Sequence, residues 1–193
     1  FGLQTRSAAP IDLGAVRANF QEAFLAVWQG EAESDLFNAL VLAAGLSWRE
    51  VVIVGAYCRY LRQVGIAFSQ AYMEQTLIGN PGLARLVVAL FKALFDPAGS
   101  GDPELRAAPI REAIAAGLDE VASADQDRIL RRFFNLVEVT QRTNYFQPGE
   151  DGRPKPYLSF KLDSRVIDEL PLPRPMFEVF VYSPRMEGIH LRG

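Results

Sequence analysis

The spacing of apolar residues divides the chain into a long helical part and a shorter part with the pattern of β-strands. Up to about residue 146, apolar residues recur every three or four positions, which is the period of an amphipathic helix. From Tyr157 onward they recur every second position or run continuously, as they do in strands. The sequence therefore predicts an α+β fold, mainly an α-helical bundle of about seven helices followed by a small antiparallel β segment at the C-terminus. We divide it into a helical domain, 1–146, and a β segment, 147–193.

Capping residues and helix breakers indicate where the helices begin and end. Ser47 and Glu50 have the spacing of a capping box, in which each side chain bonds a backbone N–H group at the start of a helix. Pro109 lies inside a predicted helix and removes one hydrogen bond, so we expect a kink or break there. Turn-forming residues at 96–103 predict the clearest loop of the chain. The expected helices span residues 12–29, 33–44, 47–64, 69–80, 81–95, 102–122 and 123–145.

Two strands and a hairpin are predicted in the C-terminal part. Residues 157–162 alternate between apolar and polar, with Phe160 on the apolar face, so this strand should be exposed on one side. Residues 176–182 are apolar on both faces except for Glu178, which is typical of an interior strand. Turn residues at 183–188 then predict an antiparallel hairpin.

Composition narrows the classes of function. The formal net charge of -3 provides no basic surface for nucleic acid, so we expect no nucleic-acid partner. The longest apolar runs, such as residues 51–58, are shorter than the roughly 20 residues of a membrane-spanning helix. The first ten residues lack the cationic start and apolar core of a secretory signal. We therefore expect a cytoplasmic protein without a membrane partner.

The sequence lacks the common motifs for nucleotides and metals. Gly99 and Gly101 begin a glycine-rich pattern, but Glu104 stands where the third glycine would fall, and the pattern follows a predicted helix instead of a strand. A zinc site needs three or four cysteine or histidine ligands, whereas this chain has one of each. We therefore expect neither a dinucleotide site nor a metal site within the chain.

The single cysteine and the single histidine are the most reactive side chains by type. Cys58 lies on the inward face of its predicted helix, where we expect a small core residue instead of a reactive thiol. His190 alternates with apolar neighbours, so we expect it to face solvent or a partner segment. No carboxylate or nucleophile is tied to His190 by the sequence, which argues against a catalytic role.

Other clusters of charged and aromatic residues have structural explanations. The acid pairs are expected at helix N-termini, where negative charge is favourable. The arginine cluster resembles an anion site only without its acidic neighbours, so we expect a salt-bridged surface. The tryptophans are expected to pack instead of serving as ligand platforms. The residues concerned are Glu31, Glu33, Asp125, Asp127, Arg128, Arg131, Arg132, Trp28 and Trp48.

Long blocks of the chain carry a family resemblance. The most specific are residues 127–133 (DRILRRF), 142–147 (RTNYFQ), 155–163 (KPYLSFKLD) and 171–193, the last of which contains PMFEVFVYSPRMEGIHLRG. Together with residues 23–38 they resemble the large, single-chain bacterial NAD-dependent glutamate dehydrogenases. The resemblance covers essentially the whole chain and is weakest from 97 to 120.

The resemblance implies an enzyme that oxidatively deaminates L-glutamate to 2-oxoglutarate with NAD. In that family this segment lies immediately before a Gly-Gly-Ile-Arg motif that opens the substrate-binding part of the catalytic core, so residues 147–193 would be the first strands of the substrate-binding domain. The catalytic Lys and Asp and the nucleotide fold come later. It therefore implies no catalytic, cofactor-binding or metal residue in this chain. NAD would bind outside it, and no metal is expected.

Two functions remain open. The first is a noncatalytic segment of a longer dehydrogenase, whose helices support the catalytic core or take part in assembly; an unfinished sheet and an initial Phe1 favour it. Its partners would be the remainder of the parent chain and further copies in a homo-oligomer. The second is a self-standing helical interaction or regulatory module that binds a protein partner or a small effector. The second function requires a closed fold.

Overall fold

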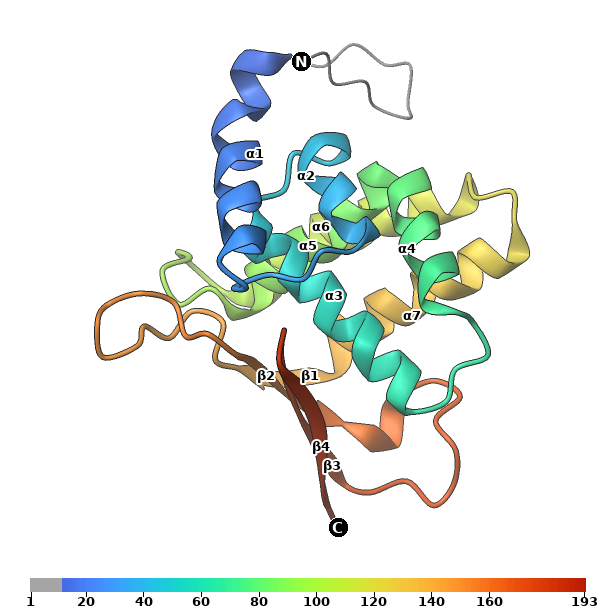
Figure 1. The fold of residues 1–193 in the computed structure, drawn as a ribbon. Helices are drawn as coiled ribbons and strands as arrows, with labels where there is room; N and C mark the ends of the chain where they lie inside the picture. Colours follow the sequence, from blue (N-terminus) through green and yellow to red (C-terminus); the bar gives the residue numbers. More distant parts are fainter. Residues whose placement is uncertain (1–11) are drawn as a thin grey trace.

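A helical body and an antiparallel sheet make up the structure, a computed structural model that describes residues 12–193 (Figure 1). The α+β class and the order of helices before strands are therefore confirmed. The first ten residues, where no secretory signal is expected, lie outside the described part. The helices are α1 (Leu13–Trp28), η1 (Leu36–Ala39), α2 (Leu40–Ala43), α3 (Trp48–Gln63), α4 (Gln70–Gly79), α5 (Pro81–Phe95), α6 (Pro103–Asp119) and α7 (Ala124–Val139). The remaining elements are β1 (Thr140–Thr143), β2 (Leu158–Asp163), η2 (Ser164–Val166), β3 (Phe177–Ser183) and β4 (Met186–Arg192).

Local capping chemistry begins several helices where the sequence predicts it. The Asp12 carboxylate accepts the backbone N–H of Gly14 at 2.9 Å at the start of α1. Both halves of the capping box form at α3, where the Glu50 carboxylate accepts the N–H of Ser47 at 2.9 Å. Pro81 occupies the first turn of α5, where its missing N–H costs no helical bond. These helix starts are therefore determined within a few residues of sequence.

Three helices differ from their predicted course. The second begins only after Asp35 and is a 3₁₀ turn followed by one turn of α-helix. Helix α6 continues through Pro109, so the predicted break is absent. Pro109 has no N–H for the Leu105 carbonyl, but both residues are exposed, so water can bond this carbonyl. The last helix ends at Val139 instead of around Tyr145, because the next four residues form β1, which pairs with β2.

The four strands form one antiparallel sheet in the order β1-β2-β3-β4. Strand β3 lies between two partners, which confirms it as an interior strand. The hairpin is also confirmed, but its turn is shorter than predicted, since Ser183 already pairs with Met186. Along β2, burial alternates residue by residue, with Phe160 inside, as the apolar pattern predicts.

A single hydrophobic core joins the helices to the sheet. Helix α3 is at its centre, with Tyr57 and Tyr60 fully buried. The Tyr57 ring stacks on Phe160 of β2 at a centroid distance of 4.3 Å, and Phe91 of α5 meets the same Phe160 edge-on at 5.9 Å. Figure 1 shows the strands gathered along the side of the helical body at which α3 and α7 end. Helices and strands therefore stabilise one another.

Candidate functional site: the groove along helix α5

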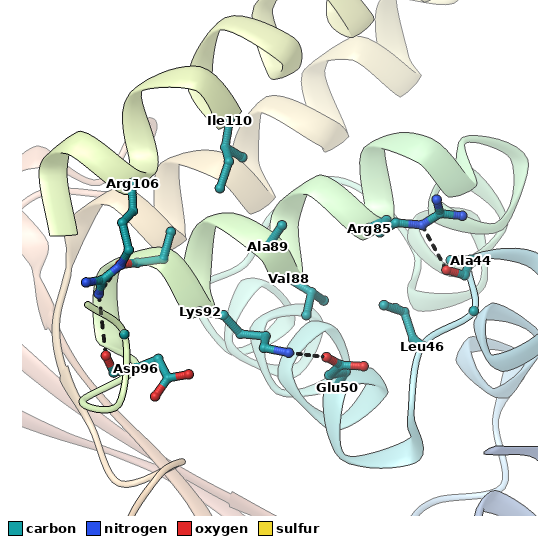
Figure 2. A pocket seen from close by; sticks show the side chains of 13 residues that line it. Ala44, Leu46, Glu50, Arg85, Val88, Ala89, Lys92, Asp96, Arg106 and Ile110 are labelled. Carbon is teal, nitrogen blue, oxygen red and sulfur yellow. Dashed lines mark hydrogen bonds and ion pairs between the residues drawn. The ribbon is translucent and has the colours of Figure 1, made fainter. Parts of the chain in front are cut away.

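An open groove of about 780 Å³ runs along α5, between α6 and the turn that precedes α3 (Figure 2). Its floor is apolar and is built partly from small side chains, which leave the space open. The residues that form this floor are Leu46, Val88, Ala89, Ala93 and Ile110. The groove is thus a concave surface with an apolar base, and its charged groups lie along its length.

An ion pair crosses the groove near its middle. Lys92 Nζ donates to Glu50 Oε1 at 2.9 Å, and Glu50 Oε2 accepts the Ser47 hydroxyl at 3.0 Å. Burial raises the pKa of the Glu50 carboxyl, but the hydrogen bonds from Lys92 and Ser47 outweigh this, so the pKa is below its ordinary value. Glu50 is therefore an ionised carboxylate that stabilises the start of α3.

Two arginines at the ends of the groove bond backbone carbonyls. Arg85 Nε donates to the Ala44 carbonyl at 3.0 Å. Arg106 donates to the Ala93 carbonyl at 2.8 Å and to the Ser100 and Gly101 carbonyls at 3.1 and 3.0 Å. Arg106 thereby fastens the predicted 96–103 loop to α5. None of the groove's thirteen described lining residues is a serine, cysteine or histidine, so the groove offers shape and charge for binding but no nucleophile of these types.

Neither Cys58 nor His190 is among the residues that line this groove. Cys58 is fully buried on α3, as expected for its inward face, and burial together with the nearby Glu74 carboxylate raises the pKa of its thiol to about 12. His190 is exposed on β4, opposite Val179 of β3. The expected burial of Cys58 and exposure of His190 are both confirmed.

The acidic pairs occupy two different environments. Asp125 and Asp127 lie in the first turn of α7, as predicted. Glu31 and Glu33 lie instead in the loop between α1 and η1, so their predicted place at a helix N-terminus is wrong. Glu33 pairs there with Arg59 of α3 at 2.6 Å, a contact across 26 residues that local sequence does not specify.

The arginine cluster of α7 is salt-bridged, as predicted. Arg128 pairs with Glu169 at 2.6 Å, and Arg131 pairs with Asp127 at 2.8 Å. Arg132 also contacts the Glu169 carboxylate, but its side chain is only 7% exposed, so it is not a surface residue. Asp127 and the Glu169 carboxylate of the loop after η2 thus neutralise the cations that an anion site would need.

The two tryptophans behave differently. Trp48 is half-buried against the core, as expected for a packing residue. Trp28 is 80% exposed at the end of α1, so its predicted packing role is not met within residues 12–193. Helical spacing indicates which residues share a face, but not which face the rest of the chain covers.

Two buried hydrogen bonds join the helical body to the strands and were not predicted. Tyr60 of α3 donates to Glu178 of β3. Tyr57 lies 2.8 Å from the Thr140 hydroxyl, whose own hydrogen is donated to the Leu136 carbonyl at 2.6 Å, so Tyr57 is the donor. One signal for the first pair was available, since Glu178 is the only acid in an otherwise apolar strand.

The described residues contain neither a cluster of metal ligands nor a single membrane-spanning helix. Within residues 12–193, no group of three or more His, Cys, Asp or Glu side chains is arranged to hold a metal ion. In the same part of the chain, no single helix is long and apolar enough to cross a membrane. Helices α4 and α5 satisfy such a criterion only as a pair bent by 98°.

Family models match most of the chain. Residues 32–97 match "Glutamate dehydrogenase, helical motif 3", and residues 113–193 match "Bacterial NAD-glutamate dehydrogenase, catalytic domain". The first match contains α3 and the groove helix α5, and the second contains α7 and the sheet. Helix α1 precedes both.

Similar proteins include the NAD-specific glutamate dehydrogenase of Halomonas elongata, which is 45% identical over 196 residues. The proteins of the same name from Mycobacterium tuberculosis and Pseudomonas aeruginosa are 49% and 44% identical over 180 and 186 residues. These alignments cover 92–100% of this chain but only 11–12% of each relative. The chain thus spans about one eighth of the length of the relatives it matches. It belongs to the bacterial NAD-glutamate dehydrogenase family, in which it corresponds to a segment that leads from a helical motif into the catalytic domain.

Proposed function

We propose that this chain is a noncatalytic structural segment of an NAD-dependent glutamate dehydrogenase. The parent enzyme would convert L-glutamate, NAD and water into 2-oxoglutarate, ammonia and NADH. In this proposal NAD binds outside the segment, no metal takes part, and the partners are the rest of the parent chain and further copies in a cytoplasmic homo-oligomer. The segment holds the first strands of the catalytic domain in place.

The contact of α3 with the sheet is the observation that carries this proposal. Helix α3 lies in the region that matches the helical motif, whereas its partners lie in the region that matches the catalytic domain. Tyr57 stacks on Phe160, and Tyr60 bonds Glu178, both inside the shared core. A buried aromatic stack and a buried hydrogen bond resist displacement of the strands, which is the property a supporting segment needs.

The state of the reactive groups agrees with a noncatalytic role. Cys58 is buried with a raised pKa, so its thiol is neither accessible nor ionised near neutral pH. The charged groups of the α5 groove, Lys92 and Arg106 among them, are engaged in bonds that stabilise helix starts and a loop. These charged groups therefore stabilise the fold, which accounts for their positions without a catalytic role.

Kinetics of the parent enzyme test the proposal. The variants Cys58→Ala and His190→Gln should leave kcat and KM for glutamate and NAD unchanged. Loss of about 100-fold in kcat, the size typical of removing a general acid or base, would contradict a noncatalytic segment. The isolated chain should form no NADH from glutamate, and calorimetry that finds micromolar affinity for NAD would also overturn the proposal.

A structural role predicts a separate effect on stability. The variant Tyr57→Phe in the parent enzyme should lower the temperature at which activity is lost, because it removes the hydrogen bond to Thr140. At low temperature kcat should be preserved, since no reacting group is touched. A fall in kcat at all temperatures with unchanged thermal stability would argue against a supporting segment.

A further inference from the structure

Helix α1 packs with its small side chains inward and its large ones outward. Its inward face is marked by Ala23 and Ala26, which are 7% and 3% exposed. Its outward face carries four large apolar side chains, which we call the aromatic ridge: Phe20, Phe24, Leu25 and Trp28, with exposures of 38%, 60%, 52% and 80%. A surface helix of a soluble domain normally has the opposite arrangement. The described part of the chain therefore leaves the more hydrophobic face of α1 uncovered.

The aromatic side chains of the ridge pack against each other on the surface of α1. The rings of Phe24 and Trp28, one helical turn apart, are stacked with a centroid distance of 6.4 Å and an interplanar angle of 15°. Large aromatic residues bury about 150–250 Å² each and are enriched at the centres of interfaces. A contiguous exposed group of this kind marks an interaction surface. Figure 1 shows α1 at the margin of the helical body, so a neighbouring segment can reach it.

The length of the relatives favours one occupant. Because the matched segment makes up only 12% of the Halomonas relative, most of such a polypeptide lies outside the described residues. A second copy of α1 is a poorer partner, since a helix of 16 residues is about 24 Å long and presents far less than the roughly 800 Å² per partner of a stable dimer. A segment of the same polypeptide also pays a smaller entropic cost of association than a separate molecule does.

We propose that the aromatic ridge of α1 is buried by an apolar helical surface from another part of the same longer polypeptide. Phe20, Phe24 and Trp28 recur every four residues, and such rows insert into the groove between side chains of a second helix. Helix α1, which packs on α2 and α3, then connects the segment to a more distant part of the enzyme through its aromatic side. The inference rests on the proposed function only in that the chain is part of a longer protein.

Thiol labelling tests this inference. The variant Phe24→Cys is prepared in the isolated chain and in the full-length parent, and labelling by a maleimide is followed by peptide mass spectrometry. The native Cys58 is buried, so it does not interfere. Leu105→Cys, at a side chain that is 75% exposed on α6, sets the rate for an accessible thiol in the isolated chain. We expect Phe24→Cys to label as fast as this reference in the isolated chain and at least tenfold more slowly in the parent.

Two outcomes would overturn the inference. Equal labelling of Phe24→Cys in the isolated chain and in the folded parent would mean that nothing covers the ridge. Protection in the isolated chain that increases with protein concentration would instead identify a second copy as the partner. Glutamate oxidation is assayed separately on the same parent preparation. Failure of the proposed function would therefore appear as a parent enzyme that does not oxidise glutamate. Failure of the inference would appear as fast labelling of Phe24→Cys in the folded parent.

Discussion

The hydroxyl of Tyr60 on α3 donates a hydrogen bond to the carboxylate of Glu178 on β3, 118 positions later in the sequence. Both residues are buried, and Glu178 is only 4% exposed. Burial and the adjacent carboxylate both raise the pKa of Tyr60 above its ordinary value, so the phenol keeps its proton. This polar contact inside the apolar core thus links the helical motif to the catalytic-domain strands.

The first prediction concerns this pair. Replacing Tyr60 by Phe leaves the Glu178 carboxylate buried without its donor, which should lower the free energy of unfolding by about 2–3 kcal/mol. Urea denaturation of the isolated chain measures the change. In a double-mutant cycle, Glu178→Leu should remove most of the penalty of Tyr60→Phe. Additive effects of the two substitutions would show that the residues do not interact.

The second prediction concerns the pH dependence of stability. Burial and the neighbouring carboxylates Glu74 and Glu33 raise the pKa of Asp35 from 3.8 to about 6. Between these values the folded carboxyl binds more protons than the unfolded one, so stability should rise as the pH falls from about 7 to about 4. The variant Asp35→Asn keeps a capping side chain for η1 and removes the titration.

Thermal unfolding at several pH values measures this effect. The native chain should gain about 2 kcal/mol over that interval relative to Asp35→Asn, a figure already reduced for the partial exposure of the group. Asp102→Asn, the same substitution at the exposed N-cap aspartate of α6, is the matched control for replacing a capping aspartate by asparagine. Parallel profiles for the native chain and Asp35→Asn would refute the assignment to Asp35.

The third prediction concerns the loop between α5 and α6. Arg106 donates to carbonyls at both ends of this loop, so Arg106→Ala should release it and increase amide exchange at residues 98–101 by at least tenfold. Gly99→Ala should have a similar effect, because a Cβ at Gly99 would lie 2.7 Å from Arg106 Cζ. Glu104→Gln, in the same helix, is the control. Unchanged exchange in both Arg106→Ala and Gly99→Ala would show that the guanidinium does not order the loop.

The fourth prediction concerns Cys58. With its pKa raised to about 12, only about one thiol in ten thousand is ionised at pH 8, and the side chain is buried. Its reaction with a disulfide reagent should therefore proceed only as fast as the chain opens, and it should accelerate in urea in step with unfolding. The expected rate is independent of reagent concentration when opening is limiting. Rapid labelling of the native chain would mean that α3 is not packed as described.

Sequence patterns predicted those structural elements that are determined by interactions between residues close in the sequence. The starts of α1, α3, α4 and α7 follow from a side chain that bonds an N–H group two or three residues away. The alternation along β2 follows from the pleat of a strand with one covered face. In each case the interacting groups lie within a few residues of one another, so their spacing is visible in the sequence.

Features that depend on residues far apart in the sequence were predicted less well. The end of α7 at Val139 depends on β2, a strand that begins at Leu158. The sequence predicts Glu33 at a helix start, but Glu33 binds Arg59. It predicts Arg132 on the surface, but Arg132 is buried against Glu169. The environment of each of these residues depends on a partner that is distant in the sequence, so local spacing does not predict it.

By itself, the sequence determined the class of fold, the order of its elements, the inward position of Cys58 and the resemblance to glutamate dehydrogenases. Periodicity, capping and block similarity are properties of neighbouring residues, which is why they can be recognised without coordinates. Only the tertiary structure decided that Tyr60 meets Glu178, that a groove opens along α5 and that α1 turns its aromatic face outward. These features depend on which surfaces meet when the chain packs, and packing is a balance over the whole core.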